Sequence, residues 1–137
     1  MEEKKYTDLS GASALDIARQ AGLELLKKQA RDLKLYCVQD TTVIADYYLI
    51  ATGRASTHVK ALADELADKM ALHNVTVDRV EGRDGGAWIL VDLGCVIVHI
   101  FDRESREYYN LERLLRPEDE ISTEELEALA DEASENA

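Results

Sequence analysis

The stretch Ala87-Trp-Ile-Leu-Val-Asp-Leu-Gly-Cys-Val-Ile-Val-His-Ile-Phe101 decides the fold, because it holds two apolar runs rich in β-forming residues. Leu93-Gly94 separates the runs and is typical of a turn between paired strands, so we expect a β-hairpin. The second run, residues 95–101, is apolar at every position except His99. A strand that is apolar on both faces predicts a central place in the sheet.

Two helices and three strands are predicted before this hairpin, and the first two strands and both helices are described first. Residues 35–38 and 46–52 are rich in strand formers. A second helix is predicted over 56–72, where Val59, Leu62, Ala63, Leu66, Ala67 and Met70 recur on one side. Near the N-terminus, Ser13 and Asp16 open another helical pattern. Its apolar members are Leu15, Ala18, Gly22, Leu25, Leu26 and Leu33.

The remaining elements complete an α/β fold. Residues 75–80 alternate as a third strand, and residues 83–86 give a turn signal before the hairpin. Residues 103–115 predict a helical or 3₁₀ stretch that Pro117 ends. The order of elements favours the α/β class, with a mixed β-sheet flanked by helices.

Acidic and basic residues are unevenly distributed along the 137-residue chain, whose net charge is −12. Residues 117–137 hold nine acidic residues and no lysine or arginine, which leaves 19 acidic against 16 basic residues in 1–116. We therefore predict a flexible lead-in (1–12), one domain (13–116) and an acidic segment (117–137). Because binding to a phosphate backbone favours a basic face, a basic protein partner fits this chain better than nucleic acid.

A short amphipathic helix is predicted inside the acidic segment. Ser122 with Glu125 forms a capping box, and Ile121 with Leu126 forms a hydrophobic staple. A helix of this length is marginal alone and needs a surface on which to dock.

Several features favour a cytoplasmic protein. The charged N-terminus is followed by no apolar signal core, and no apolar run reaches the roughly 18 residues of a membrane span. Cys37 and Cys95 lie in apolar, β-rich segments and have no metal-ligand spacing. We expect both to be reduced and neither to bind a metal.

The best catalytic candidate is the turn Gly53-Arg-Ala-Ser56, where backbone N–H groups can face an anion. Nucleotidyltransferases use a Gly-Ser turn at such a place, with strand carboxylates that hold Mg²⁺. The expected Asp-x-Asp is missing, and Asp64-Glu65 lies inside a predicted helix. The three histidines share no metal-ligand spacing. We favour an ordinary tight turn and expect no catalytic residue, metal or cofactor.

Aromatic residues near the hairpin are candidates for partner binding. Trp88 follows a glycine turn at a strand start, and Tyr108 and Tyr109 are adjacent on a predicted helix, so both can hardly face one core. Aromatic residues with a polar edge are favoured as interface anchors. The alternative is a core tryptophan plus one exposed tyrosine. Acidic residues that could form a rim are Asp92, Asp102, Glu104, Glu107 and Glu112.

Blocks along most of the chain carry a resemblance to a known family. They are Asp46-Tyr-Tyr-Leu-Ile-Ala-Thr-Gly53, Ser56-Thr-His-Val-Lys-Ala-Leu-Ala-Asp64, Val80-Glu-Gly82, Trp88-Ile-Leu-Val-Asp-Leu-Gly94, Val96-Ile-Val-His-Ile-Phe101 and Arg106-Glu-Tyr-Tyr-Asn-Leu-Glu112. In this order they resemble the ribosomal silencing factor (Iojap-like) family over roughly residues 13–115. The chain departs from the family at Cys95, where an acidic residue is usual, and near Leu115, where a tryptophan is usual.

The resemblance implies a nucleotidyltransferase-like fold without catalytic carboxylates. It also implies a protein that binds the fourteenth protein of the large ribosomal subunit, blocks an inter-subunit bridge and represses translation. Family members are often homodimers off the ribosome. We expect the partner-binding residues to be Trp88, Asp92, His99, Asp102, Glu107, Tyr108, Tyr109, Glu112 and Leu115. A nucleotidyltransferase that uses the Gly53–Ser56 turn and a large-subunit assembly factor stay open as alternatives.

Overall fold

A computed structural model describes residues 6–135. Its strands are β1 (Arg31–Cys37), β2 (Tyr47–Gly53), β3 (Arg79–Glu81), β4 (Trp88–Asp92), β5 (Val96–Asp102) and β6 (Glu120–Ile121). Its helices are α1 (Ala14–Lys27), α2 (Ser56–Leu72), α3 (Arg103–Tyr109) and α4 (Glu124–Glu135), with 3₁₀ turns η1 (Leu111–Leu114) and η2 (Pro117–Asp119). The strands form one sheet in the order β3-β4-β5-β2-β1-β6, with β2 and β5 parallel. The predicted α/β class with a mixed, helix-flanked sheet is confirmed.

The hairpin that decides the fold is present as β4 and β5, which pair antiparallel. Gly94 adopts a φ of 88° in the turn, and its N–H donates to the Asp92 carboxylate at 2.8 Å. The predicted central place of β5 is confirmed, since β4 pairs with one side of it and β2 with the other. All of β5 except Asp102 is buried.

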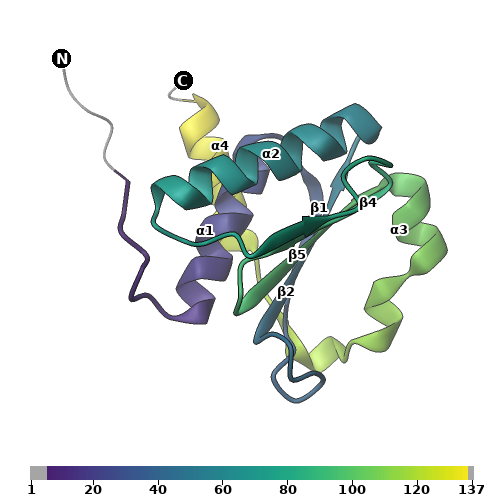
Figure 1. Ribbon diagram of the computed structural model, residues 1–137, viewed down its shortest axis with the longest axis horizontal. Coiled ribbons are helices and arrows are strands. Elements are labelled where there is room, and N and C mark those ends of the chain that lie inside the picture. The colour runs from purple at the N-terminus through teal and green to yellow at the C-terminus, as the bar shows by residue number, and fades with distance from the viewer. Residues whose placement is uncertain (1–5, 136–137) are drawn as a thin grey trace.

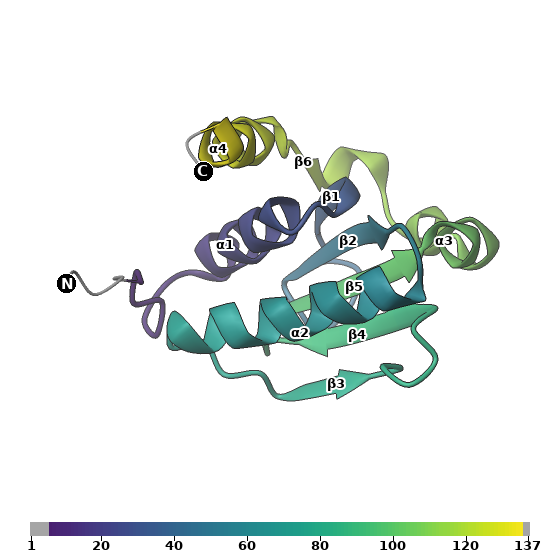
Figure 2. The ribbon, with the colours of Figure 1, turned by 90° about the horizontal axis from the view of Figure 1, so that it is seen from above.

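The two faces of the sheet are covered differently. Helices α1 and α2 lie across one face, as Figure 2 shows, and bury a core that includes Leu49, Val98 and Ile100. The opposite face carries a smaller apolar cluster that includes Ile97 and Phe101. Within residues 6–135, the arc of α3, η1 and η2 runs along this second face (Figure 1), and Trp88 and Leu90 on it are only partly buried.

Helix α1 ends earlier than the apolar pattern predicted. The predicted start is confirmed, because the Ser13 hydroxyl accepts the N–H of Asp16 at 3.2 Å. Leu33, however, lies in β1 and not in the helix. The helix stops at Lys27, and Gln29 then takes a left-handed φ of 69° that redirects the chain. Leu33 fitted the helical spacing because buried strand residues are also apolar.

The third strand is shorter than predicted and begins later. Residues 75–78 lie outside β3, although Val75 is buried in the core. The N–H of Val75 donates to the carbonyl of Met70 at 2.9 Å and so helps to close α2. Asn74, with a left-handed φ of 63°, makes that turn possible. The apolar alternation of 75–80 therefore reflects core packing at its start and strand pairing only at its end.

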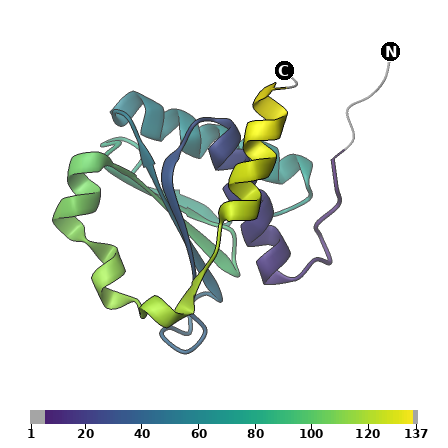
Figure 3. The same ribbon diagram turned by 180° about the vertical axis from the view of Figure 1, so that it is seen from behind.

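The acidic segment is folded against the domain (Figure 3). Ile121 of β6 pairs with Leu35 of β1, and α4 lies beside α1. The predicted short helix is thus present, with Leu126 buried on Gly22. The predicted capping pair is wrong: the Ser122 hydroxyl accepts the N–H of Glu124, not Glu125, because the helix already starts from the Thr123 carbonyl.

The predicted flexible lead-in, residues 1–12, is described only in part. Residues 1–5 of the lead-in and residues 136–137 lie outside the described residues. Within the remainder of the lead-in, Leu9 is buried, and its N–H donates to the His73 carbonyl at 2.8 Å. No helix among residues 6–135 is both long and apolar enough to span a lipid bilayer.

Candidate functional site

Trp88 is the centre of an aromatic cluster on the open face of the sheet. Its ring stacks on Phe101 with centroids 4.9 Å apart, and Tyr109 of α3 packs at the same centroid distance. The indole N–H donates to Nδ1 of His99 at 3.1 Å. Trp88 remains half-buried, so this well-held residue is still partly accessible to solvent. A rigid, partly exposed tryptophan is suited to anchoring a partner.

His99 is buried beneath this aromatic cluster and holds Trp88 through a hydrogen bond. Its side chain is 4% exposed, and Tyr48 packs edge-on against it with centroids 4.7 Å apart. Because Nδ1 accepts the indole N–H, the neutral ring carries its proton on Nε2. Nε2 has no hydrogen-bond partner among the described residues. His99 therefore contributes to the surface through the orientation of Trp88.

Burial of His99 predicts a pH-dependent stability. Desolvation lowers the pKa of His99 from 6.5 to about 4. The neutral ring stabilises the folded state above the unfolded pKa, and this contribution is lost as the pH falls through the folded pKa. We expect wild type to lose about 3 kcal/mol of unfolding free energy relative to His99→Asn between about pH 7 and about pH 4.

Chemical denaturation of both proteins across this pH range measures the effect. Protonation of carboxylates that the two proteins share cancels in the difference between their unfolding free energies. A difference that stays constant with pH would contradict the assignment of His99 as a buried neutral ring.

Helix α3 places exposed side chains beside the Trp88 cluster. Tyr108 is 81% exposed and Tyr109 47%, and their rings meet edge to face at 5.1 Å. Glu107 is also exposed and lies 3.7 Å from Arg103 in an ion pair open to solvent. Together with Trp88, these side chains form what we call the aromatic surface: Trp88, Glu107, Tyr108 and Tyr109. Of the two adjacent tyrosines, Tyr108 is the one that points away from the core.

The other predicted acidic residues are engaged in structural contacts. Asp92 binds the Gly94 N–H and lies 3.3 Å from Arg79, at the opposite end of β4 from Trp88. Asp102 caps α3 by accepting the N–H of Ser105 at 2.7 Å. Both carboxylate oxygens of Glu112 accept from the Arg106 guanidinium at 3.2 Å. Asp102 and Glu112 thereby hold α3 and η1 in place.

Leu115 differs from the other predicted site residues because it is buried. It belongs to the apolar cluster beneath η1, with Tyr36, Val38 and Ile97. Its packing fixes the path of the chain after α3. Its place in the fold is therefore that of a supporting residue under the surface.

Sequence reasoning missed other apolar side chains that are exposed. Val43 is fully exposed and Ile44 largely so, on the loop between β1 and β2, and Leu114 is exposed on η1. Arg116, two residues after Leu114, reaches Asp40 on that loop at 3.6 Å. Two β-branched residues inside a predicted connection were a signal that could have found this loop.

The Gly53–Ser56 turn is explained by packing. A Cβ on Gly53 would lie 2.8 Å from the Val59 side chain and 3.0 Å from its backbone nitrogen, so only glycine lets α2 approach β2. His58 accepts the Arg54 N–H on Nδ1 at 2.9 Å, and its Nε2 donates to the Lys28 carbonyl at 2.9 Å. Within residues 6–135, no group of three or more His, Cys, Asp or Glu side chains could hold a metal ion.

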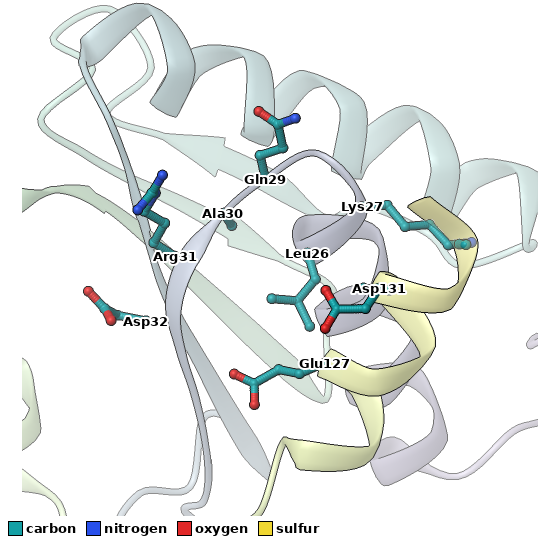
Figure 4. A pocket seen from close by; sticks show the side chains of 10 residues that line it. Leu26, Lys27, Gln29, Ala30, Arg31, Asp32, Glu127 and Asp131 are labelled. Carbon is teal, nitrogen blue, oxygen red and sulfur yellow. The ribbon is translucent and has the colours of Figure 1, made fainter. Parts of the chain in front are cut away.

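A groove of about 990 Å³ lies between the end of α1 and α4. Figure 4 shows Leu26 between the two helices, with Glu127 and Asp131 reaching toward the groove from α4. Arg31 and Asp32 lie across the groove on β1, and Lys27 lies at the end of α1 beside α4. The mixed charges and the exposed lining offer no set of side chains arranged for catalysis.

Comparison with known proteins identifies the family. The family described as "Ribosomal silencing factor during starvation" matches residues 12–137. The chain belongs to the ribosomal silencing factor family. The family match extends over the acidic segment and therefore includes β6 and α4, which the resemblance over residues 13–115 left out.

Relatives of this ribosomal silencing factor include bacterial and organellar proteins. The chain is 40% identical over 87 residues to "Ribosomal silencing factor RsfS" of Bacillus subtilis, which covers 64% of this chain and 74% of that protein. It is 32% identical over 94 residues to mouse "Mitochondrial assembly of ribosomal large subunit protein 1", covering 66% and 41%. A crystal structure of a Chromobacterium violaceum protein superposes with a TM-score of 0.73 at 30% identity, covering 75% and 86%.

Proposed function

We propose that this protein represses translation in the cytoplasm by binding the large ribosomal subunit at its fourteenth protein. In this position it blocks an inter-subunit bridge and prevents the two subunits from joining. The mechanism is steric and needs no catalytic step. Family membership supports the ribosomal target, and the aromatic surface supports the mode of binding.

The observation that carries the proposal is the rigid exposure of Trp88. Its hydrogen bond to His99 and its packing between Phe101 and Tyr109 fix the ring before a partner arrives. Pre-organisation reduces the entropy that is lost on binding. Tyr108 and Tyr109 add exposed aromatic area next to it. Trp88 and Tyr109 act as the apolar anchors in this proposal.

Charge complements these anchors. The net charge of −12 attracts a basic protein and steers its approach. Glu104 and Glu107 are exposed on α3 and give the aromatic surface an acidic rim. Asp92 lies at the other end of β4, where it pairs with Arg79, and is not part of this rim. Such rim charges act mainly on association rate and weaken in salt.

A role in large-subunit assembly is the second candidate, and the name of the mouse relative favours it. Both candidates use the same subunit and the same surface. They differ in timing, because an assembly factor acts on immature particles and a silencing factor acts on mature ones.

Sucrose-gradient profiles of cells with and without the protein test the proposal. We expect its loss during nutrient limitation to increase joined ribosomes and decrease free mature large subunits. The subunits that remain free should contain a complete set of proteins and fully processed RNA. Accumulation of immature large subunits on deletion would instead support the assembly role and contradict silencing as the primary function.

A further inference from the structure

Several arginines lie close together where strands β1, β2 and β5 reach the same end of the sheet. Strands β2 and β5 are parallel, and Gly53 pairs with Asp102. The residues that follow them, Arg54 and Arg103, therefore leave the sheet side by side. In the antiparallel neighbour β1, Arg31 pairs with Thr52 and brings a third guanidinium to the same edge.

Arg106 forms the wall of this region. Its side chain is 11% exposed, and Nη1 donates to the Thr52 hydroxyl at 2.8 Å and to the Asp32 carbonyl at 2.6 Å. Glu112 neutralises its charge. Arg106 is thus a fixed structural element and leaves the other arginines to face solvent.

These residues line a hollow of about 820 Å³, which lies within the range of roughly 300–1,000 Å³ typical of small-ligand sites. Its charged lining has five basic residues (Arg31, Lys34, Arg54, Arg103 and Arg106) and three acidic ones (Asp32, Glu107 and Glu112). A basic excess is unusual in a chain of net charge −12.

Two of the arginines are available to a ligand. Among residues 6–135, neither Arg31 nor Arg54 has a carboxylate within ion-pair distance, and the Arg54 guanidinium donates to the side-chain oxygen of Gln29 at 2.9 Å. The ion pair between Arg103 and Glu107 is long and exposed. Planar guanidinium groups recognise phosphate oxygens through paired N–H donors.

We propose that this hollow binds the phosphate groups of a small phosphorylated molecule of about nucleotide size. Arg31 and Arg54 bind the phosphate oxygens, and Arg103 contributes from the end of β5. The ligand is small because the acidic chain as a whole repels an extended nucleic-acid backbone. A small anion inside the hollow is screened from distant acids beyond about 8 Å. The hollow shares Glu107 with the aromatic surface, but the phosphate-binding arginines lie outside that surface, so the inference does not depend on the proposed function.

Two-dimensional amide and arginine side-chain NMR of the full chain, titrated with pyrophosphate and with adenosine diphosphate, tests the site. We expect saturable shifts at Arg31, Gly53 and Arg54. The double variant Arg31→Gln/Arg54→Gln should weaken binding by about tenfold or more, as expected when two charge-assisted contacts are lost. Arg19→Gln/Arg83→Gln has the same change in net charge at other exposed positions and should bind within about twofold of wild type.

Three results would overturn the inference. The first is the absence of saturable shifts at about 10 mM pyrophosphate, a concentration well above the dissociation constant expected for a specific phosphate site. The second is equal weakening in both double variants, which would indicate a general charge effect. The third is tighter binding of a short single-stranded RNA than of adenosine diphosphate at these arginines, which would assign the hollow to nucleic acid.

Discussion

Replacing Trp88 with alanine is expected to lower the affinity for isolated large ribosomal subunits by about thirtyfold or more. Truncating a buried anchor at an interface typically costs about 2 kcal/mol or more, which corresponds to that factor. The loss includes the packing of Tyr109 and Phe101, which touch the indole. Co-sedimentation with subunits at low ionic strength, over a series of protein concentrations, measures the change.

Two further variants separate binding from folding. Tyr108→Ala removes an 81% exposed ring and leaves the Trp88 cluster intact, so it should weaken binding without changing the unfolding free energy. Leu72→Ala removes an exposed apolar side chain at the end of α2 and should leave affinity unchanged. Unaltered co-sedimentation of a folded Trp88→Ala protein would rule out the aromatic surface as the binding site.

Gly82→Ala is expected to destabilise the protein by about 2–4 kcal/mol, through left-handed strain and a backbone clash. Gly82 has a φ of 81°, and a Cβ there would lie 2.2 Å from the carbonyl oxygen of Trp88. The start of β4 must shift to relieve this contact. We therefore expect the substitution to weaken subunit binding as well, because it displaces Trp88.

Gly85→Ala in the same loop is the matched control. Its φ is not left-handed, and its Cβ would meet nothing closer than 4.0 Å. The unfolding free energy, measured by chemical denaturation, should change by less than about 0.5 kcal/mol. Similar losses in the two variants would show that the loop tolerates no side chain at all, and that the contact with Trp88 is not the cause.

The strongest elements of the fold were predictable from local pattern. The bounds of α2 match the predicted 56–72, because its apolar stripe faces one core. The hairpin followed from two β-forming runs around a glycine turn. The two-residue β6 was not predictable, since its pairing with β1 depends on a contact between residues far apart in sequence. The end of α1 depends on the backbone angle of Gln29, which side-chain periodicity does not encode.

The candidate site was predictable in its residue types and less so in its geometry. Once the hairpin turn is placed, Trp88 pairs with Phe101, which brings the indole near His99. The same register puts Asp92 opposite Ile97, away from Trp88, so the predicted acidic residues do not gather in one place. The Arg106–Glu112 pair and the Asp102 cap on α3 depend on the exact path of the chain after β5, which composition could not supply.

The two-residue strand β6 also affects how copies of this molecule meet one another. It pairs with Leu35 and Tyr36 and so covers part of the outer side of β1. At the other margin of the sheet, β3 has only three residues, and Arg79 and Glu81 flank its centre. Short, charged margins discourage strands of separate molecules from joining. The two margins of this sheet therefore protect it from cross-β aggregation.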